Sequence, residues 1–127
     1  MSSIKIYQTD QFRHENKTWR RLLDFFKVEN AILKNRLSEV LDQSSDKTFL
    51  NLAEQFQNKF IIKDDYIDEL KHEINAQEEW LKLAENKLPG KKIIQRQEKL
   101  RNEMEFFEND FNNLKNGFNK YLSAAQL

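Results

Sequence analysis

Apolar residues recur at alternating steps of four and three along almost the whole chain, which is the spacing of a heptad repeat. Between residues 10 and 42 the repeat passes through Phe12, Asn16, Trp19, Leu23, Phe26, Asn30, Leu33, Leu37 and Val40. Between residues 46 and 87 it passes through Phe49, Ala53, Phe56, Phe60, Lys63, Ile67, Leu70, Ile74, Gln77, Leu81 and Ala84. Between residues 91 and 125 it passes through Ile93, Gln97, Leu100, Met104, Phe107, Phe111, Leu114, Phe118, Tyr121 and Ala125. A 3.5-residue period sustained in this way predicts long helices that supercoil around one another.

Two short clusters of turn-forming residues interrupt this repeat. In Gln43-Ser44-Ser45-Asp46, either Ser45 or Asp46 can cap the following helix by accepting hydrogen bonds from its free N–H groups. The second cluster is Leu88-Pro89-Gly90, where the proline disfavours helical geometry at the residue before it. The sequence therefore predicts helices at about residues 10–42, 46–87 and 91–125. Because short turns make neighbouring helices antiparallel, the predicted fold is all-α, a three-helix antiparallel coiled-coil bundle.

The composition agrees with long helices. The 127 residues include only two Gly and one Pro, while Glu, Lys, Leu, Gln and Asn are abundant. The predicted architecture is similar to the three-helix coiled-coil repeats of the spectrin kind, which also carry a Trp in the first helix, as Trp19 does here. This is a likeness of architecture, because one Trp on a long helix is not a family motif.

We treat residues 1–127 as one helical domain in which residues 1–9 form an N-terminal arm. If the first turn centres between Ser44 and Ser45, the start of the first helix lies beside roughly position 79 of the second. The end of the second helix, with Trp80 and Leu83, then projects past the first helix together with the start of the third. Two uncovered helices are marginal in water, so we expect the arm or another chain to pack on this tip.

Charge and cysteine content narrow the functional classes. Twenty-one basic and 21 acidic residues cancel, so no whole-molecule field favours nucleic acid or an anionic membrane. Cysteine is absent, which removes disulfides, zinc-thiolate sites and thiol catalysis and suits a reducing compartment. No apolar run approaches the roughly 18 residues of a spanning helix, and the N-terminus lacks the apolar core of a signal peptide. We expect a cytoplasmic protein without a membrane span.

Glu69 and His72 form the pattern most similar to a metal site. On a helix, a Glu-x-x-His step can place a carboxylate and an imidazole beside one ion, and ferritin-like bundles use two such motifs. Here the nearest second copy ends at His14 but begins with Gln11, an amide in place of the carboxylate. The repeat also places Glu69 and His72 away from the core. A metal-binding ferritin-like bundle therefore stays an alternative, and we expect no metal, no cofactor and no enzymatic activity.

Basic residues provide a second alternative, a nucleic-acid-binding accessory protein. Interleaved basic and aromatic side chains can grip phosphates and stack on bases. The candidate residues are Arg20, Arg21, Lys91, Lys92 and Arg96. The repeat assigns Trp19, the aromatic residue next to the first pair, to the core, so this alternative is not favoured.

Polar residues occupy several core positions of the repeat: Asn30, Lys63, Gln77 and Gln97. A buried Asn or Lys costs stability but fixes the register and oligomeric state of a coiled coil. Antiparallel folding predicts one shared polar layer made by Asn30, Lys63, Asn116 and Gly117. For Lys63 we favour a side chain that runs past Phe residues to reach solvent.

A second apolar strip on the first helix points to a protein interface. Phe25, Val28 and Ile32 fall on the face opposite Leu23 and Leu33, and Phe106 is a similar outlier on the third helix. Together with Trp80 and Leu83 at the tip, they form the predicted protein interface. A helix that is apolar on two faces usually has two neighbours. The leading interpretation is a non-enzymatic coiled-coil interaction or structural protein that self-associates or binds a protein partner.

Overall fold

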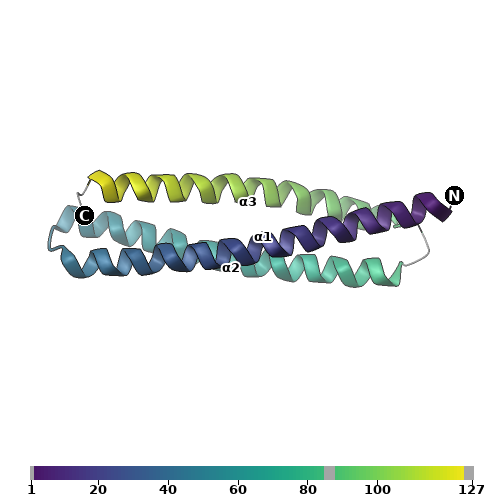
Figure 1. Cartoon of the computed structure of the whole chain (residues 1–127), viewed down its shortest axis with the longest axis horizontal. Coiled ribbons are helices and arrows are strands. Elements are labelled where there is room, and N and C mark those ends of the chain that lie inside the picture. The colour runs from purple at the N-terminus through teal and green to yellow at the C-terminus, as the bar shows by residue number, and fades with distance from the viewer. Residues whose placement is uncertain (1, 85–87, 125–127) are drawn as a thin grey trace.

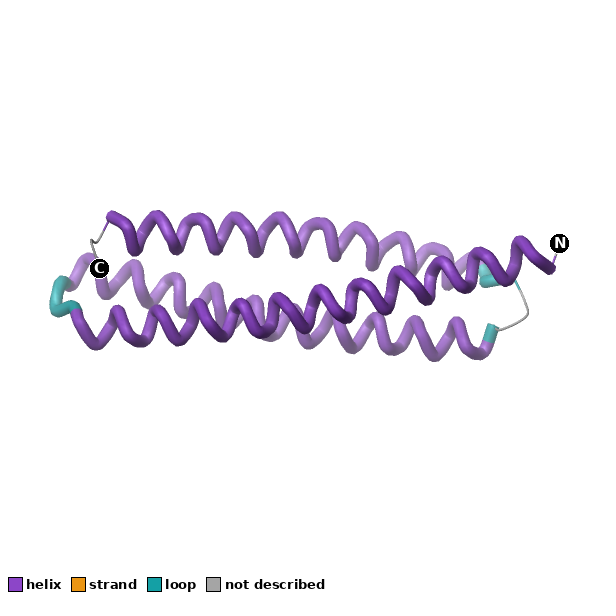
Figure 2. Tube along the Cα trace, viewed as in Figure 1, coloured by secondary structure: helices purple, strands orange, loops and turns teal. Residues whose placement is uncertain are grey.

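A computed structural model describes the backbone of residues 2–84 and 88–124, with side chains from Gln8 onward within these ranges. Three long helices make up nearly all of it: α1 (Ser2–Gln43), α2 (Lys47–Leu83) and α3 (Lys91–Ala124) (Figure 1). Within the described residues, Figure 2 shows helices and short loops and no strand. The prediction of an all-α three-helix bundle is therefore confirmed.

Contacts between side chains establish the helix directions. Asn16 of α1 meets Glu78 of α2 and Asn30 meets Phe60, so numbers rise along α1 as they fall along α2. Glu15 of α1 meets Arg101 of α3, and Glu29 and Lys115 lie together further along, so α1 and α3 run in parallel. The helices therefore run up, down and up.

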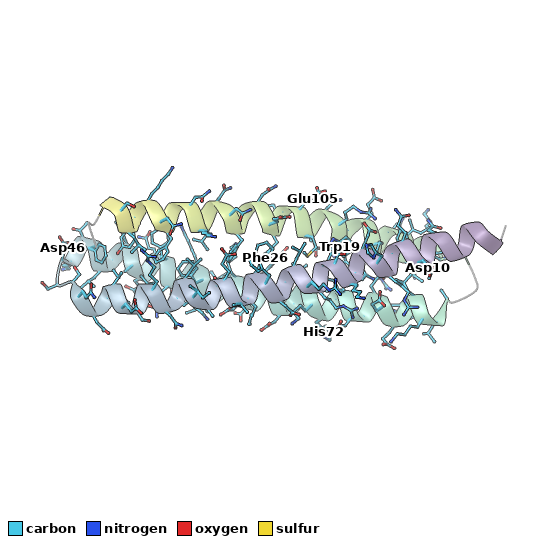
Figure 3. The ribbon with its side chains drawn as sticks, in the orientation of Figure 1. Asp10, Trp19, Phe26, Asp46, His72 and Glu105 are labelled. Carbon is cyan, nitrogen blue, oxygen red and sulfur yellow. The ribbon has the colours of Figure 1, made fainter. Side chains whose placement is uncertain are left out.

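Most of the buried core consists of positions that the repeat identified. All nine repeat positions of α1 from Phe12 to Val40 are buried. Aromatic rings fill much of the space between the helices: the Phe26 ring centroid lies 5.1 Å from that of Phe111, and the Phe60 and Phe118 centroids are also 5.1 Å apart. In Figure 3, Trp19 and Phe26 lie on the side of α1 that faces α3. The periodic pattern thus places the apolar side chains where burial stabilises the bundle most.

The helix ends follow the predicted turns in part. Asp46 caps α2, because its carboxylate accepts a hydrogen bond from the Phe49 N–H at 3.1 Å. At the second turn α2 ends at Leu83, and α3 begins at Lys91. The predicted ends at residues 87 and 125 lie outside the described residues.

Residues 2–9 of the predicted N-terminal arm are helical. Helix α1 begins at Ser2, so residues 2–9 continue it by two further turns. No Gly or Pro precedes residue 10, so nothing in this stretch ends a helix, and Thr9 is buried. Figure 1 shows the N-terminal end of α1 at the end of the bundle where α2 meets α3. Helix α1 is therefore long enough to reach the tip that the sequence left uncovered.

Among the described residues, no helix is both long and apolar enough to cross a bilayer.

Candidate protein-interaction surface

Three large apolar side chains form an exposed strip on the outer face of α1. Phe25, Val28 and Ile32 are 59%, 61% and 59% exposed, whereas Leu23 and Leu33 beside them in sequence are buried. Steps of three and four residues keep the three side chains on one face of a helix. In Figures 1 and 2, α1 lies in front of the other two helices, so its outer face has no neighbour in the bundle. We refer to these three residues as the α1 strip.

A groove between α1 and α3 continues this surface. Ile32 of the α1 strip lines it, and Val40 of α1 and Leu122 of α3 form its floor, since both are buried. Arg36 and Glu39 line the same groove and are exposed. The apolar surface therefore extends beyond the strip into a recess with a polar rim.

Charged residues of opposite sign flank the α1 strip. Lys17 and Arg21 precede it, Glu39 and Asp42 follow it, and all four are exposed. Neighbouring charges of α1 pair with the rest of the bundle: Lys27 with Asp68, and Glu29 with Lys115. Within the described part of the chain, none of the four flanking residues takes part in an ion pair.

The other predicted interface residues lie apart from the α1 strip. Phe106 is 65% exposed, but it lies one turn from Asp110, which pairs with Lys63 of α2, and so belongs to the α2 side of α3. Trp80 lies at the tip, where the Arg96 guanidinium stacks over its ring at 5.5 Å. Leu83, near the end of α2, is exposed. The structure therefore divides the six predicted residues into one strip and separate exposed positions.

A buried polar network joins all three helices near the N-terminal end of α1. Gln97 Nε2 donates to Asn16 Oδ1 at 3.0 Å, and Gln77 Nε2 donates to Gln97 Oε1 at 3.2 Å. Asn16 Nδ2 in turn donates to Glu78 Oε1 at 2.8 Å, and Arg13 lies 3.4 Å from the other oxygen of this carboxylate. Sequence reasoning identified both glutamines but missed Glu78, which lies beside the core positions rather than on them. The sequence did offer one indication that Glu78 lies in this network: it directly follows Gln77 and lies at the predicted height of Asn16.

A second polar contact surrounds Asn30. Its Nδ2 donates to the Phe60 carbonyl and to Asp64 Oδ1, both at 2.8 Å, and Lys34 also pairs with Asp64. Burial alone would raise the pKa of Asp64, but the hydrogen bonds from Lys34 and Asn30 outweigh it and lower that pKa. These bonds tie α1 to α2 in one register.

The predicted polar layer of Asn30, Lys63, Asn116 and Gly117 is wrong. Lys63 is half-buried and pairs with Asp110, and Asn116 is exposed. The predicted heights assumed that α2 continues to residue 87, whereas it ends at Leu83. The turn between α2 and α3 is therefore centred earlier in the sequence than predicted. As a result, each residue of α3 faces a residue of α2 with a lower number than predicted.

The residues of the two alternative functions are also dispersed. Glu69 and His72 are exposed, and His72 points away from the bundle in Figure 3. Across residues 2–84 and 88–124, no group of three or more His, Asp or Glu side chains could hold a metal ion. Of the basic candidates, Arg20 donates to Asn75 Oδ1 at 3.3 Å, and Arg96 stacks on Trp80. Arg21, Lys91 and Lys92 are exposed.

Comparisons of this chain with protein-family models, with curated proteins and with solved structures gave no match.

Proposed function

We propose that this chain is a non-enzymatic helical interaction module that self-associates by coiled-coil packing on the outer face of α1. The exposed α1 strip is the observation that carries this proposal. Phe25, Val28 and Ile32 lie on one helix face, each about three-fifths exposed, and contiguous exposed apolar surface of this kind marks interaction sites. Helix-to-helix recognition uses anchors at this spacing.

The polar interior supports a structural role for the rest of the bundle. Gln97 bonds to Asn16 and to Gln77, which links three helices, and mispairing the helices would break these buried hydrogen bonds. Glu78 is a buried carboxylate that accepts a hydrogen bond from Asn16 and pairs with Arg13. Both contacts join α2 to α1. A bundle held in one register presents its outer face as a fixed surface.

One part of the proposal rests on the sequence alone. The absence of cysteine suits a reducing compartment, so we place the protein in the cytoplasm. The candidate metal-site residues Glu69 and His72 are exposed on α2, and we assign them no chemistry.

Light scattering on three proteins tests the proposal. The wild type should have a mass above the 15.4 kDa of one chain, and the double variant Phe25→Lys/Ile32→Lys should fall to that value. The matched control is Phe106→Lys/Ile62→Lys, which replaces a Phe and an Ile of similar exposure, 65% and 61%, on the other two helices. This control should keep the mass of the wild type. A monomeric wild type, or loss of association only in the control, would contradict the proposal.

A further inference from the structure

We infer that two copies of this chain pair their α1 helices antiparallel, about a two-fold axis that crosses α1 near residue 30. In this arrangement Lys17 and Arg21 of one copy face Glu39 and Asp42 of the other. The inference rests on the proposed self-association and specifies its occupant, a second copy of this chain.

The outer face of α1 has three zones in sequence order. A basic zone with Lys17 and Arg21 comes first, the apolar α1 strip follows, and an acidic zone with Glu39 and Asp42 comes last. Every one of these side chains is exposed. The face is therefore complementary in charge to its own reversed copy.

The spacing of the zones fits one axis. Arg21 lies nine residues before position 30 and Glu39 lies nine residues after it, and Val28 and Ile32 lie two residues on either side. At about 1.5 Å per residue, a two-fold axis at this level brings Arg21 and the Glu39 of the second copy to the same height. The same operation brings Val28 of one copy to Ile32 of the other. A parallel pair would instead place like charges opposite one another at both ends.

The unpaired state of the flanking charges supports this choice of partner. Several charges of α1 that face α2 or α3 are neutralised, among them Asp24 by Lys71 and Glu29 by Lys115. Within the described residues, Lys17, Arg21, Glu39 and Asp42 have no such partner. A two-fold contact uses the same patch on both copies, so it closes at a dimer and leaves no further strip exposed.

Charge reversal tests the complementarity. Lys17→Glu/Arg21→Glu makes both ends of the face acidic, and Glu39→Lys/Asp42→Lys makes both ends basic. Each variant alone should dimerise at least tenfold more weakly than the wild type, in sedimentation equilibrium at low salt. An equimolar mixture should form a heterodimer as tight as the wild-type dimer. If the mixture associates no better than each variant alone, the charges do not pair and the inference is overturned.

Cysteine cross-linking tests the direction, because the natural chain contains no cysteine. Ala31→Cys and Ser38→Cys place a single thiol on the same exposed face, one heptad apart. In the antiparallel dimer the two thiols of the Ala31→Cys protein lie at nearly the same height, but those of Ser38→Cys are separated by about 24 Å along the axis. A short bis-maleimide should therefore cross-link the first variant and not the second.

The outcomes separate the inference from the proposed function. Equal cross-linking of both variants indicates a parallel pair and overturns the antiparallel inference, while self-association through α1 survives. Cross-linking of neither variant, in a protein that sediments as a dimer, overturns the inference in favour of another contact face. A wild type that sediments as a monomer removes the proposed function and this inference with it.

Discussion

Replacing Gln97 by Leu tests whether the buried polar network holds the three helices together. Gln97 is fully buried and bonds to Asn16 of α1 and Gln77 of α2. Leucine is similar in size and favourable in a core, so a packing model without the network predicts that Gln97→Leu is neutral or stabilising.

The hydrogen bonds predict the opposite result. Each bond contributes a net of about 1 kcal/mol, and a buried polar atom that loses its partner costs about 1–3 kcal/mol. Gln97→Leu removes the bonds to Gln77 and Asn16 and the two longer bonds, both 3.3 Å, to the Phe12 carbonyl and the Glu15 carboxylate. It leaves Asn16 Oδ1 buried without a hydrogen-bond partner. We therefore expect the free energy of unfolding to fall by about 2–4 kcal/mol. Burial of the apolar leucine side chain offsets part of this loss.

Urea unfolding followed by circular dichroism measures this change. With a slope of about 2 kcal/mol per molar urea, the midpoint should fall by about 1–2 M at an unchanged slope. All samples should have the same protein concentration, because association shifts apparent stability.

A double-mutant cycle provides the control. Gln77→Leu/Gln97→Leu should cost about 0.5–1.5 kcal/mol less than the two single changes added together, because the shared bond is lost only once. Gln77 Nε2 also donates to the Ile93 carbonyl, so Gln77→Leu has a cost of its own. Strictly additive effects, or a Gln97→Leu protein as stable as the wild type, would refute the role assigned to the network.

Three further predictions concern single positions. Burial is the larger cause, and the nearby charge of Glu103 the second, of a pKa of Glu73 above its ordinary 4.5. This carboxyl therefore stabilises the fold at low pH, and its contribution is lost as the pH rises through the pKa of the folded state. Glu73→Gln should therefore stabilise the protein at pH 7, with an advantage over the wild type that shrinks toward pH 4 in urea titrations. Gly117→Ala should raise the free energy of unfolding by about 0.5–1 kcal/mol, since the nearest atom outside its own helix backbone would lie 4.0 Å from the new Cβ. Asp46→Ala should lower the melting temperature by removing the α2 cap, at a cost of about 1 kcal/mol, whereas Asp46→Asn should retain most of the stability.

The sequence predicted the core well because burial follows the heptad period. Phe12, Asn30 and Val40 are far apart on α1, yet all three are buried as the repeat requires. The exposure of Phe25 and Ile32 was equally predictable, since a 3.5-residue period leaves no room for them on the inner face.

Helix ends and relative heights were less predictable. The repeat begins at Phe12, so it carried no signal for the two further turns of α1 that start at Ser2. The prediction paired Lys63 with Asn116 because it placed the end of α2 a few residues too late. Each residue of error in that position changes the predicted height of α3 beside α2 by about 1.5 Å. Glu78 was missed because a charged side chain beside a core position is normally exposed, and its burial depends on Asn16 in another helix.

Sedimentation equilibrium of the wild-type protein over a range of concentrations measures self-association through α1 without any modification of the chain. The mass should rise with concentration from 15.4 kDa toward twice that value and stop there. The same experiment on Phe25→Lys/Ile32→Lys should give 15.4 kDa throughout. A wild type that stays at 15.4 kDa at every concentration, or a variant that associates as the wild type does, would contradict self-association through α1.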